Sequence, residues 1–291
     1  MKNIVAGIAI FLFWFLPASA QNNPHTLLWE VSKKGQTNKS YLFGTFHEVN
    51  PDFFDSIKIA NEYLIKSKLL LVEAYEPNIN GERKTPIYTW NKAKWDSLLN
   101  TTQQEKFDAY IKSMYGDEEM YKSSPQLLTF LLLRNYFQGI CDTVNRKSFE
   151  VMDNRIIDIA LKSKLEVKGL EMNQINMINT SFKTDIALSD TSSTNMILKL
   201  MDYISTANTR TEIAKVLFDY KKFDVDYHFQ VISDSTEQFL TARNNNWMKA
   251  IPDYLTAKPC FIAVGFRHLT LKNGLIQQLR KLGYTVEPVK I

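Results

Sequence analysis

The stretch Ser40-Tyr-Leu-Phe-Gly44-Thr-Phe-His47 is a short apolar run that ends in a glycine, two linking residues and a histidine. Near the other end of the chain the same pattern returns as Cys260-Phe-Ile-Ala-Val-Gly265-Phe-Arg-His268. Each copy predicts a buried strand that stops at a glycine. A glycine there lets the backbone turn sharply or approach a neighbour closely, because it has no Cβ.

Each histidine would then lie at the carboxyl end of its strand, where open α/β sheets build their sites. The chain has only four histidines, so two in the same pattern favour a shared site formed by His47 and His268. The alternative is that both are capping or hydrogen-bonded loop histidines. A third histidine, His228, lies in an aromatic, charged segment without a glycine turn, and we interpret it as structural.

Two carboxylates end strands of the same kind. Residues 68–73 (Lys-Leu-Leu-Leu-Val-Glu) are an unbroken apolar run closed by Glu73, which is typical of strands buried on both faces of a parallel or mixed sheet. Residues 165–171 predict another strand, closed by Glu171. We expect Glu73 at the same sheet edge as His47, although a solvated strand end would give the same pattern.

Further polar residues accompany these strands. Asp153 lies in a predicted helix before Glu171, and Gln174 comes just after that glutamate. The run Arg243-Asn244-Asn-Asn-Trp-Met248 is unusually polar and predicts the start of a helix that reaches about Ile251, before Pro252. A capped, solvated helix start explains this run as well as a site does.

The order of elements predicts an α/β fold: a central mixed sheet from two related halves, with surrounding helices and a helical cap. Residues 26–31 and 41–43 predict a hairpin around the Gly35 turn signal. Helical spacing dominates 95–137 and 190–240, and we expect these segments to form the cap. A helix over 275–282 and a strand over 284–289 end the chain.

Residues 1–20 have a short basic start, an apolar run and a small-residue end, which predicts a signal peptide cleaved after Ala20. We therefore expect an exported protein, periplasmic or extracellular, with residues 21–291 as a single domain and no stable membrane anchor. The net charge is +4 with both signs interleaved, so nucleic acid is not an expected partner. Cys141 and Cys260 could pair, but two cysteines are not a disulfide framework.

Taken together, the two Gly-x-x-His stretches, Leu71-Val-Glu73, Gly169-Leu-Glu171 and Arg243-Asn244 resemble the TraB/GumN family. That family includes the TIKI metal-dependent peptidases and the PrgY-type pheromone-shutdown proteins. The resemblance covers about residues 27–289. It implies metal ligands from His47, His268, Glu73 and Glu171, and catalytic roles for Glu73, Glu171, Arg243 and Asn244. Phe266 and Arg267 are bulkier than the small residues expected in the second motif, which puts substrate access in question.

Two neutral imidazoles and one or two carboxylates suit a divalent ion such as Mn²⁺, Co²⁺ or Zn²⁺. Metal sites with an open position activate water and polarise a carbonyl. One carboxylate, which we take to be Glu73, could be the general base, with Arg243 stabilising the oxyanion. We therefore expect an exported metallohydrolase with a peptide or protein substrate. The alternatives are a non-catalytic protein that binds a metal, haem or a peptide, and a structural envelope protein whose histidines cap strands.

Overall fold

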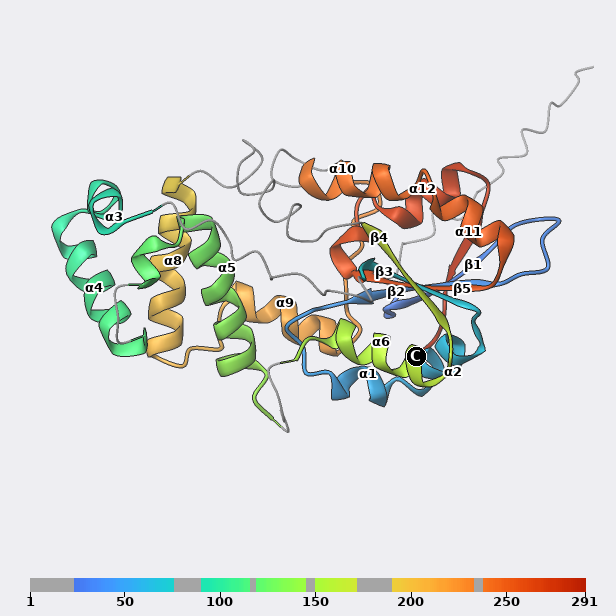
Figure 1. The fold of residues 1–291 in the computed structure, drawn as a ribbon, viewed down its shortest axis with the longest axis horizontal. Helices are drawn as coiled ribbons and strands as arrows, with labels where there is room; N and C mark the ends of the chain where they lie inside the picture. The colour runs from blue at the N-terminus through green and yellow to red at the C-terminus, as the bar shows by residue number, and fades with distance from the viewer. Residues whose placement is uncertain (1–23, 76–89, 116–118, 145–149, 172–189, 233–237) are drawn as a thin grey trace, which may run out of the picture.

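The computed structural model describes residues 24–75, 90–115, 119–144, 150–171, 190–232 and 238–291. Within these residues the chain forms a mixed six-stranded sheet in the order β4-β3-β5-β2-β1-β6, with helices around it (Figure 1). The predicted α/β class is confirmed. The strands are β1 (Leu28–Ser32), β2 (Ser40–Thr45), β3 (Leu69–Ala74), β4 (Glu166–Glu171), β5 (Cys260–Gly265) and β6 (Thr285–Pro288).

The register places the two Gly-x-x-His strands side by side. β2 and β5 are parallel, with Thr45 opposite Gly265, and β3 pairs in parallel with β5 on its other side. β4 extends the parallel part, with Glu171 opposite Ala74. The predicted hairpin is present as the antiparallel pair β1–β2, and β6 pairs antiparallel with β1. The carboxyl ends of four parallel strands therefore meet at one sheet edge.

The inner strands are apolar because both of their faces are covered. Every residue of β2 is buried, as are all of β5 before its glycine. β4 differs because it is an edge strand, and its outer residues are exposed and charged. Glu166 there pairs with Lys168 and Lys258. Charged side chains on an edge oppose pairing with a further strand.

Helices cover both faces of the sheet. Figure 1 shows α1 (Asp52–Ser56), α2 (Lys58–Lys66) and α6 (Met152–Lys162) on one face. The opposite face carries α10 (Gln238–Trp247), α11 (Ile251–Ala257) and α12 (Leu275–Lys281). Two of the site elements, α6 and α10, therefore reach the same sheet edge from opposite sides.

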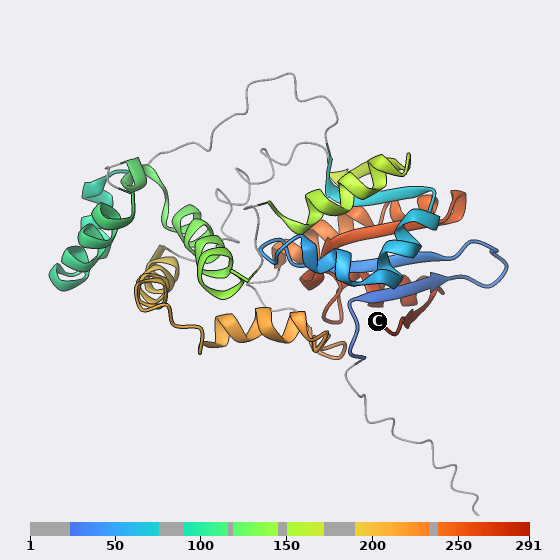
Figure 2. The same ribbon diagram turned by 90° about the horizontal axis from the view of Figure 1, so that it is seen from below.

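A second group of helices lies beside the sheet (Figures 1 and 2). Near the sheet, α9 (Glu212–Lys221) and η2 (Tyr136–Cys141) reach the end of β2. The Tyr220 hydroxyl donates to the carbonyl of Gly44 at 2.7 Å, and the Phe137 ring lies 5.1 Å from that of Phe46. The two segments predicted to be helical, 95–137 and 190–240, are largely helical where the structure describes them, but residues 222–232 are not helical. The group consists of α3 (Lys92–Leu98), α4 (Thr101–Tyr115), η1 (Glu119–Lys122), α5 (Pro125–Asn135), η2 (Tyr136–Cys141), α8 (Asp190–Ser205) and α9 (Glu212–Lys221).

The prediction of a helix that starts at Arg243 and runs to Ile251 is wrong. Arg243 and Asn244 lie inside α10, and Pro252 sits in the first turn of α11 instead of following a helix end. Proline is tolerated there because the first turn needs no backbone N–H. The asparagines resembled a cap, but Asn244 bonds to a distant residue instead.

Some of the residues singled out in the sequence are not covered by the structure. Residues 1–20, the predicted signal peptide, and Gln174 lie outside the described residues. Where the structure describes the chain, no helix combines the length and apolar character that a membrane crossing requires. Cys141 and Cys260 are both free thiols, and Cys260 is buried at the start of β5.

Candidate functional site

The two motif glycines are needed for close packing at the sheet edge. A Cβ on Gly44 would lie 2.9 Å from Cβ and 3.0 Å from Cα of Phe266, so the two motifs touch through this glycine. A Cβ on Gly265 would lie 3.1 Å from Oε1 of Glu73. The missing side chain lets the Gly265 backbone N–H donate to that same oxygen at 2.7 Å. The turn after β5 thereby holds the Glu73 carboxylate in place.

His47 follows β2 and is oriented by Asp153 of α6. Nδ1 of His47 lies 2.5 Å from Oδ2 of Asp153, and the Thr45 hydroxyl donates to Oδ1 of the same carboxylate at 3.1 Å. A carboxylate only accepts, so Nδ1 of His47 carries a proton. The other nitrogen, Nε2, lies 3.8 Å from Oε1 of Glu73, and the side chain is 43% exposed.

His268 is held in the same way by an amide. It lies in a 3₁₀ turn, η4 (Phe266–His268), and its side chain is only 3% exposed. Nδ1 lies 2.7 Å from Oδ1 of Asn244, whose Nδ2 donates to the His268 carbonyl at 3.1 Å. This second bond sets the direction of the amide, so Nδ1 of His268 is the donor and Nε2 is the unprotonated nitrogen, which can accept. Nε2 lies 3.6 Å from Oε1 of Glu73.

Arg243 joins the remaining members. Its Nη2 donates to Oε2 of Glu73 at 2.6 Å, and Nε and Nη2 donate to Glu171 at 2.7 and 3.2 Å. Its Nη1 lies 3.0 Å from Nε2 of His268. The guanidinium carbon lies 4.7 Å from the centre of the Trp247 ring, and the indole N–H donates to Glu171 at 3.0 Å. Trp247 also packs against His268, with ring centres 4.3 Å apart.

The two histidines have opposite electrostatic surroundings. The Asp153 carboxylate is the main reason that the pKa of His47 rises from 6.5 to about 10, although burial opposes it. Burial is the main reason that the pKa of His268 falls to about 3, and Arg243 adds to the effect. His268 is therefore a neutral imidazole near pH 7, whereas the ring of His47 is held protonated by its carboxylate partner.

Glu73 is ionised at any moderate pH. Burial alone would raise its pKa, but His268, His47, Arg243 and the Gly265 N–H outweigh burial and lower the pKa to about 2. The cluster thus contains a firmly anionic carboxylate that faces two Nε2 atoms. Two nitrogen atoms and one carboxylate oxygen, all of them atom types that bind metal ions, therefore lie close together.

The structure brings together nearly all of the residues singled out in the sequence. Glu171 differs in its partners: within the described part of the chain its side chain bonds to Arg243 and Trp247 and to neither histidine. Trp247 was missed, although it lies one helical turn after Arg243, a spacing that places two side chains on one helix face. The members are His47, Glu73, Asp153, Glu171, Arg243, Asn244, Trp247 and His268.

The two bulky residues of the second motif, Phe266 and Arg267, have different surroundings. Phe266 packs into an aromatic cluster, 5.5 Å from both Phe46 and Tyr220 by ring centres. Arg267 is exposed. Packing between the two motifs explains the bulky residue at Phe266.

Comparison with protein families matches the TraB/PrgY/gumN family over residues 27–288. The chain belongs to this family. The matched range of this TraB/PrgY/gumN member includes both Gly-x-x-His motifs, which meet at β2 and β5. No curated protein and no solved structure matches the chain.

The site of this TraB/PrgY/gumN member fits a divalent metal in donor type and direction. Two atoms bonded to one ion at about 2 Å lie at most about 4 Å apart, and both Nε2 to Oε1 separations, 3.8 and 3.6 Å, satisfy this. Both imidazoles also direct Nε2 toward Glu73 while a hydrogen bond fixes Nδ1, as metal-binding histidines usually do. His47, which is protonated near pH 7, would release its Nε2 proton when the ion binds. In the present arrangement, however, the described residues contain no group of three or more His, Cys, Asp or Glu side chains placed to hold a metal ion. Arg243 already donates to Nε2 of His268.

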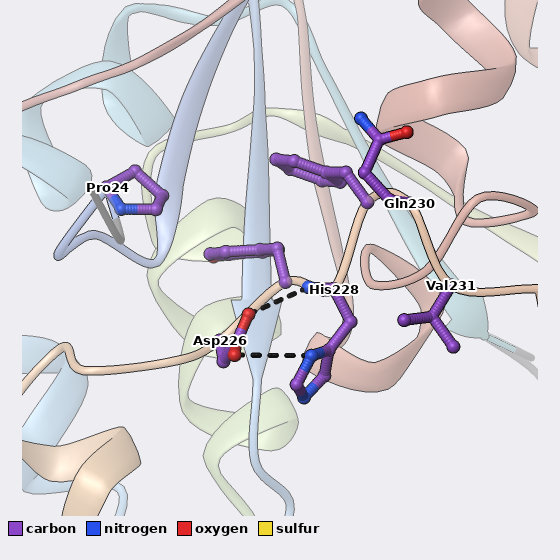
Figure 3. A pocket seen from close by; sticks show the side chains of 7 residues that line it. Pro24, Asp226, His228, Gln230 and Val231 are labelled. Atoms are coloured by element: carbon purple, nitrogen blue, oxygen red, sulfur yellow. Dashed lines mark hydrogen bonds and ion pairs between the residues drawn. The ribbon is translucent and has the colours of Figure 1, made fainter. Parts of the chain in front are cut away.

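A surface hollow of about 220 Å³ lies elsewhere, lined by Pro24 and residues 226–231 (Figure 3). His228 borders it and bonds to Asp226, with Nδ1 3.2 Å from a carboxylate oxygen. Within the described residues, the side-chain partner of His228 is Asp226 and not a member of the site. The hollow therefore adds nothing to the chemistry of the site.

Proposed function

We propose that the protein is a metal-dependent hydrolase, with a peptide or protein as its substrate. The observation that carries the proposal is that two imidazole Nε2 atoms, from motifs far apart in the chain, face one oxygen of Glu73. Each imidazole has its Nδ1 proton bound by a separate acceptor, Asp153 or Asn244. Histidine caps of strands would not need this common direction.

His47, His268 and Glu73 would hold the ion, and the donor types favour Mn²⁺, Co²⁺ or Zn²⁺. When bound, such an ion supplies Lewis acidity that polarises a carbonyl and makes water a better nucleophile near neutral pH. Glu73 suits the role of an ionised ligand better than that of a general base. A base works best with a pKa near the working pH, and the pKa of Glu73 is about 2.

Arg243 is the residue suited to stabilise negative charge on a reacting oxygen. Its guanidinium is buried with Glu73 and Glu171, with 10% of the side chain exposed. Glu171 accepts two hydrogen bonds from this guanidinium, and the ring of Trp247 packs against it. A donor held in advance in a site of low dielectric is the arrangement that stabilises a developing oxyanion.

Peptides are the favoured substrate class because of the resemblance to the TIKI peptidases. The test is hydrolysis of a fluorogenic peptide library by the purified protein with Mn²⁺, Co²⁺ or Zn²⁺ added singly. We expect a metal-dependent rate that His268→Ala abolishes and His228→Ala, a matched histidine outside the cluster, retains. Hydrolysis that survives both a chelator and His268→Ala would contradict the proposal.

The rival function is a protein that binds a metal, haem or a peptide on the same site without turnover. The same assay separates the two, because binding measured by calorimetry without any cleavage supports the rival. Glu73→Gln then assigns the role of the carboxylate. If Glu73 is a ligand, metal affinity and rate fall together, whereas a general base would lose the rate and keep the metal.

A further inference from the structure

The guanidinium of Arg243 occupies the lone pair that a metal ion would use. Nδ1 of His268 is the donor to Asn244, so Nε2 is the only ring nitrogen left to bind an ion, and it accepts from Nη1 of Arg243 at 3.0 Å. The same guanidinium binds Oε2 of Glu73 at 2.6 Å. Two of the three candidate ligands, His268 and Glu73, are thus already bound to the Arg243 guanidinium.

We propose that Arg243 competes with the metal ion for His268 and Glu73, so that metal binding requires the guanidinium to leave His268. This inference rests on the proposed function, because it assumes that His268 and Glu73 are ligands.

The structure provides the partners that Arg243 would keep. Nε and Nη2 bind both oxygens of Glu171, and the face of Trp247 lies under the guanidinium. Neither contact uses Nη1, the atom that lies on His268. The guanidinium can therefore give up His268 while its charge stays paired with a carboxylate, which avoids leaving a buried cation alone.

The test is the affinity of the purified protein for Co²⁺, measured by calorimetry without substrate. Arg243→Gln removes the competing donor from Nε2 and leaves an amide that can still bond to Glu171. A hydrogen bond to a charged group is large enough that its removal should tighten Co²⁺ binding by about tenfold or more.

Removing any positive charge near the site should also strengthen Co²⁺ binding. The control variant must therefore remove a positive charge without freeing Nε2 of His268. Arg267→Gln does this, because Arg267 is the neighbour of His268 in the same motif and is exposed. We expect this variant to change Co²⁺ affinity by about twofold or less, since exposed charges are screened.

Equal tightening in both variants would mean that only net charge matters, and would overturn the competition while leaving the metal site in place. Unchanged or weaker binding by a folded Arg243→Gln protein would overturn it as well. If neither the wild type nor this variant binds Co²⁺, Mn²⁺ or Zn²⁺, the proposed function fails together with the inference.

Arg243→Gln could unfold the protein because it leaves two buried carboxylates with a weaker partner. A second measurement therefore uses the wild type: arginine side-chain ¹⁵N signals are followed by NMR during titration with Zn²⁺. We expect the Nη signals of Arg243 to change as the site fills, while the Nε signal keeps the shift of a bonded group. Nη signals that stay unchanged at saturation would refute the competition.

Discussion

Asp153→Asn tests the pairing that orients His47. The Asp153 carboxylate lies 2.5 Å from Nδ1 of His47 and is the main reason that the pKa of this ring rises to about 10. Asparagine keeps the shape and can still accept from Nδ1, but it removes the negative charge. The pKa of His47 should therefore fall toward its ordinary value.

The size of the fall follows from the geometry. An opposite charge within about 4–6 Å shifts a pKa by about 1–3 units, and the contact here is shorter. His47 is 43% exposed, so solvent weakens the pairing and the fall should stay within that range. Glu73, at 3.8 Å from Nε2, remains in the variant and still raises the pKa of His47, but burial, which has the larger effect of the two, lowers it.

The assay is NMR of ¹³Cε1-labelled histidine, which is practical because the chain has four histidines. The His47 signal, assigned with His47→Gln, should have its titration midpoint near pH 10 in the wild type and about 1–3 units lower in Asp153→Asn. Asp158→Asn removes a carboxylate from the same helix, α6, and should leave the titration unchanged. A wild-type His47 that titrates near pH 6.5, or an unaltered titration in Asp153→Asn, would refute the reasoning.

Two further predictions concern stability. Gly44→Ala places a Cβ 2.9 Å from Cβ of Phe266 and 3.0 Å from its backbone, which should lower the free energy of unfolding by about 1–3 kcal/mol in urea; an unchanged midpoint would contradict the packing. The pKa of His268 falls from 6.5 to about 3 on folding, so between these values the unfolded chain binds more protons and stability decreases as pH decreases. The loss is at most about 1.4 kcal/mol per pH unit. His268→Gln should reduce this slope between about pH 6.5 and 5, above the range where Glu73 titrates, and an identical slope would exclude a buried neutral His268.

The strands that carry the site were predictable because their sequences are unusual. Buried parallel strands are unbroken apolar runs, and β2, β3 and β5 are such runs closed by a glycine or a glutamate. Each run places a polar residue at a carboxyl end, so one sheet edge could collect His47, Glu73 and His268. The strand order could not be predicted in the same way, because β5 inserts between β2 and β3 through contacts far apart in the sequence.

The helix of Arg243 shows why local signals failed. Asparagine favours helix starts because its side chain can bond to nearby backbone N–H groups, so the polar run suggested a cap. In the structure Asn244 lies inside α10 and bonds to His268, a partner that only the fold brings near. Trp247 is similar: its indole binds Glu171, and nothing in the sequence connects these two residues.

The central claim is that the two Gly-x-x-His motifs hold one metal ion, and the most direct test is metal content and affinity. Wild type, His47→Ala, His268→Ala and the double variant would be dialysed against Mn²⁺, Co²⁺ or Zn²⁺ and analysed by elemental mass spectrometry and calorimetry. We predict about one ion per wild-type chain, much weaker binding in each single variant, and no further loss in the double variant because both residues serve one ion. Equal binding by all four proteins, or none by the wild type, would contradict the account.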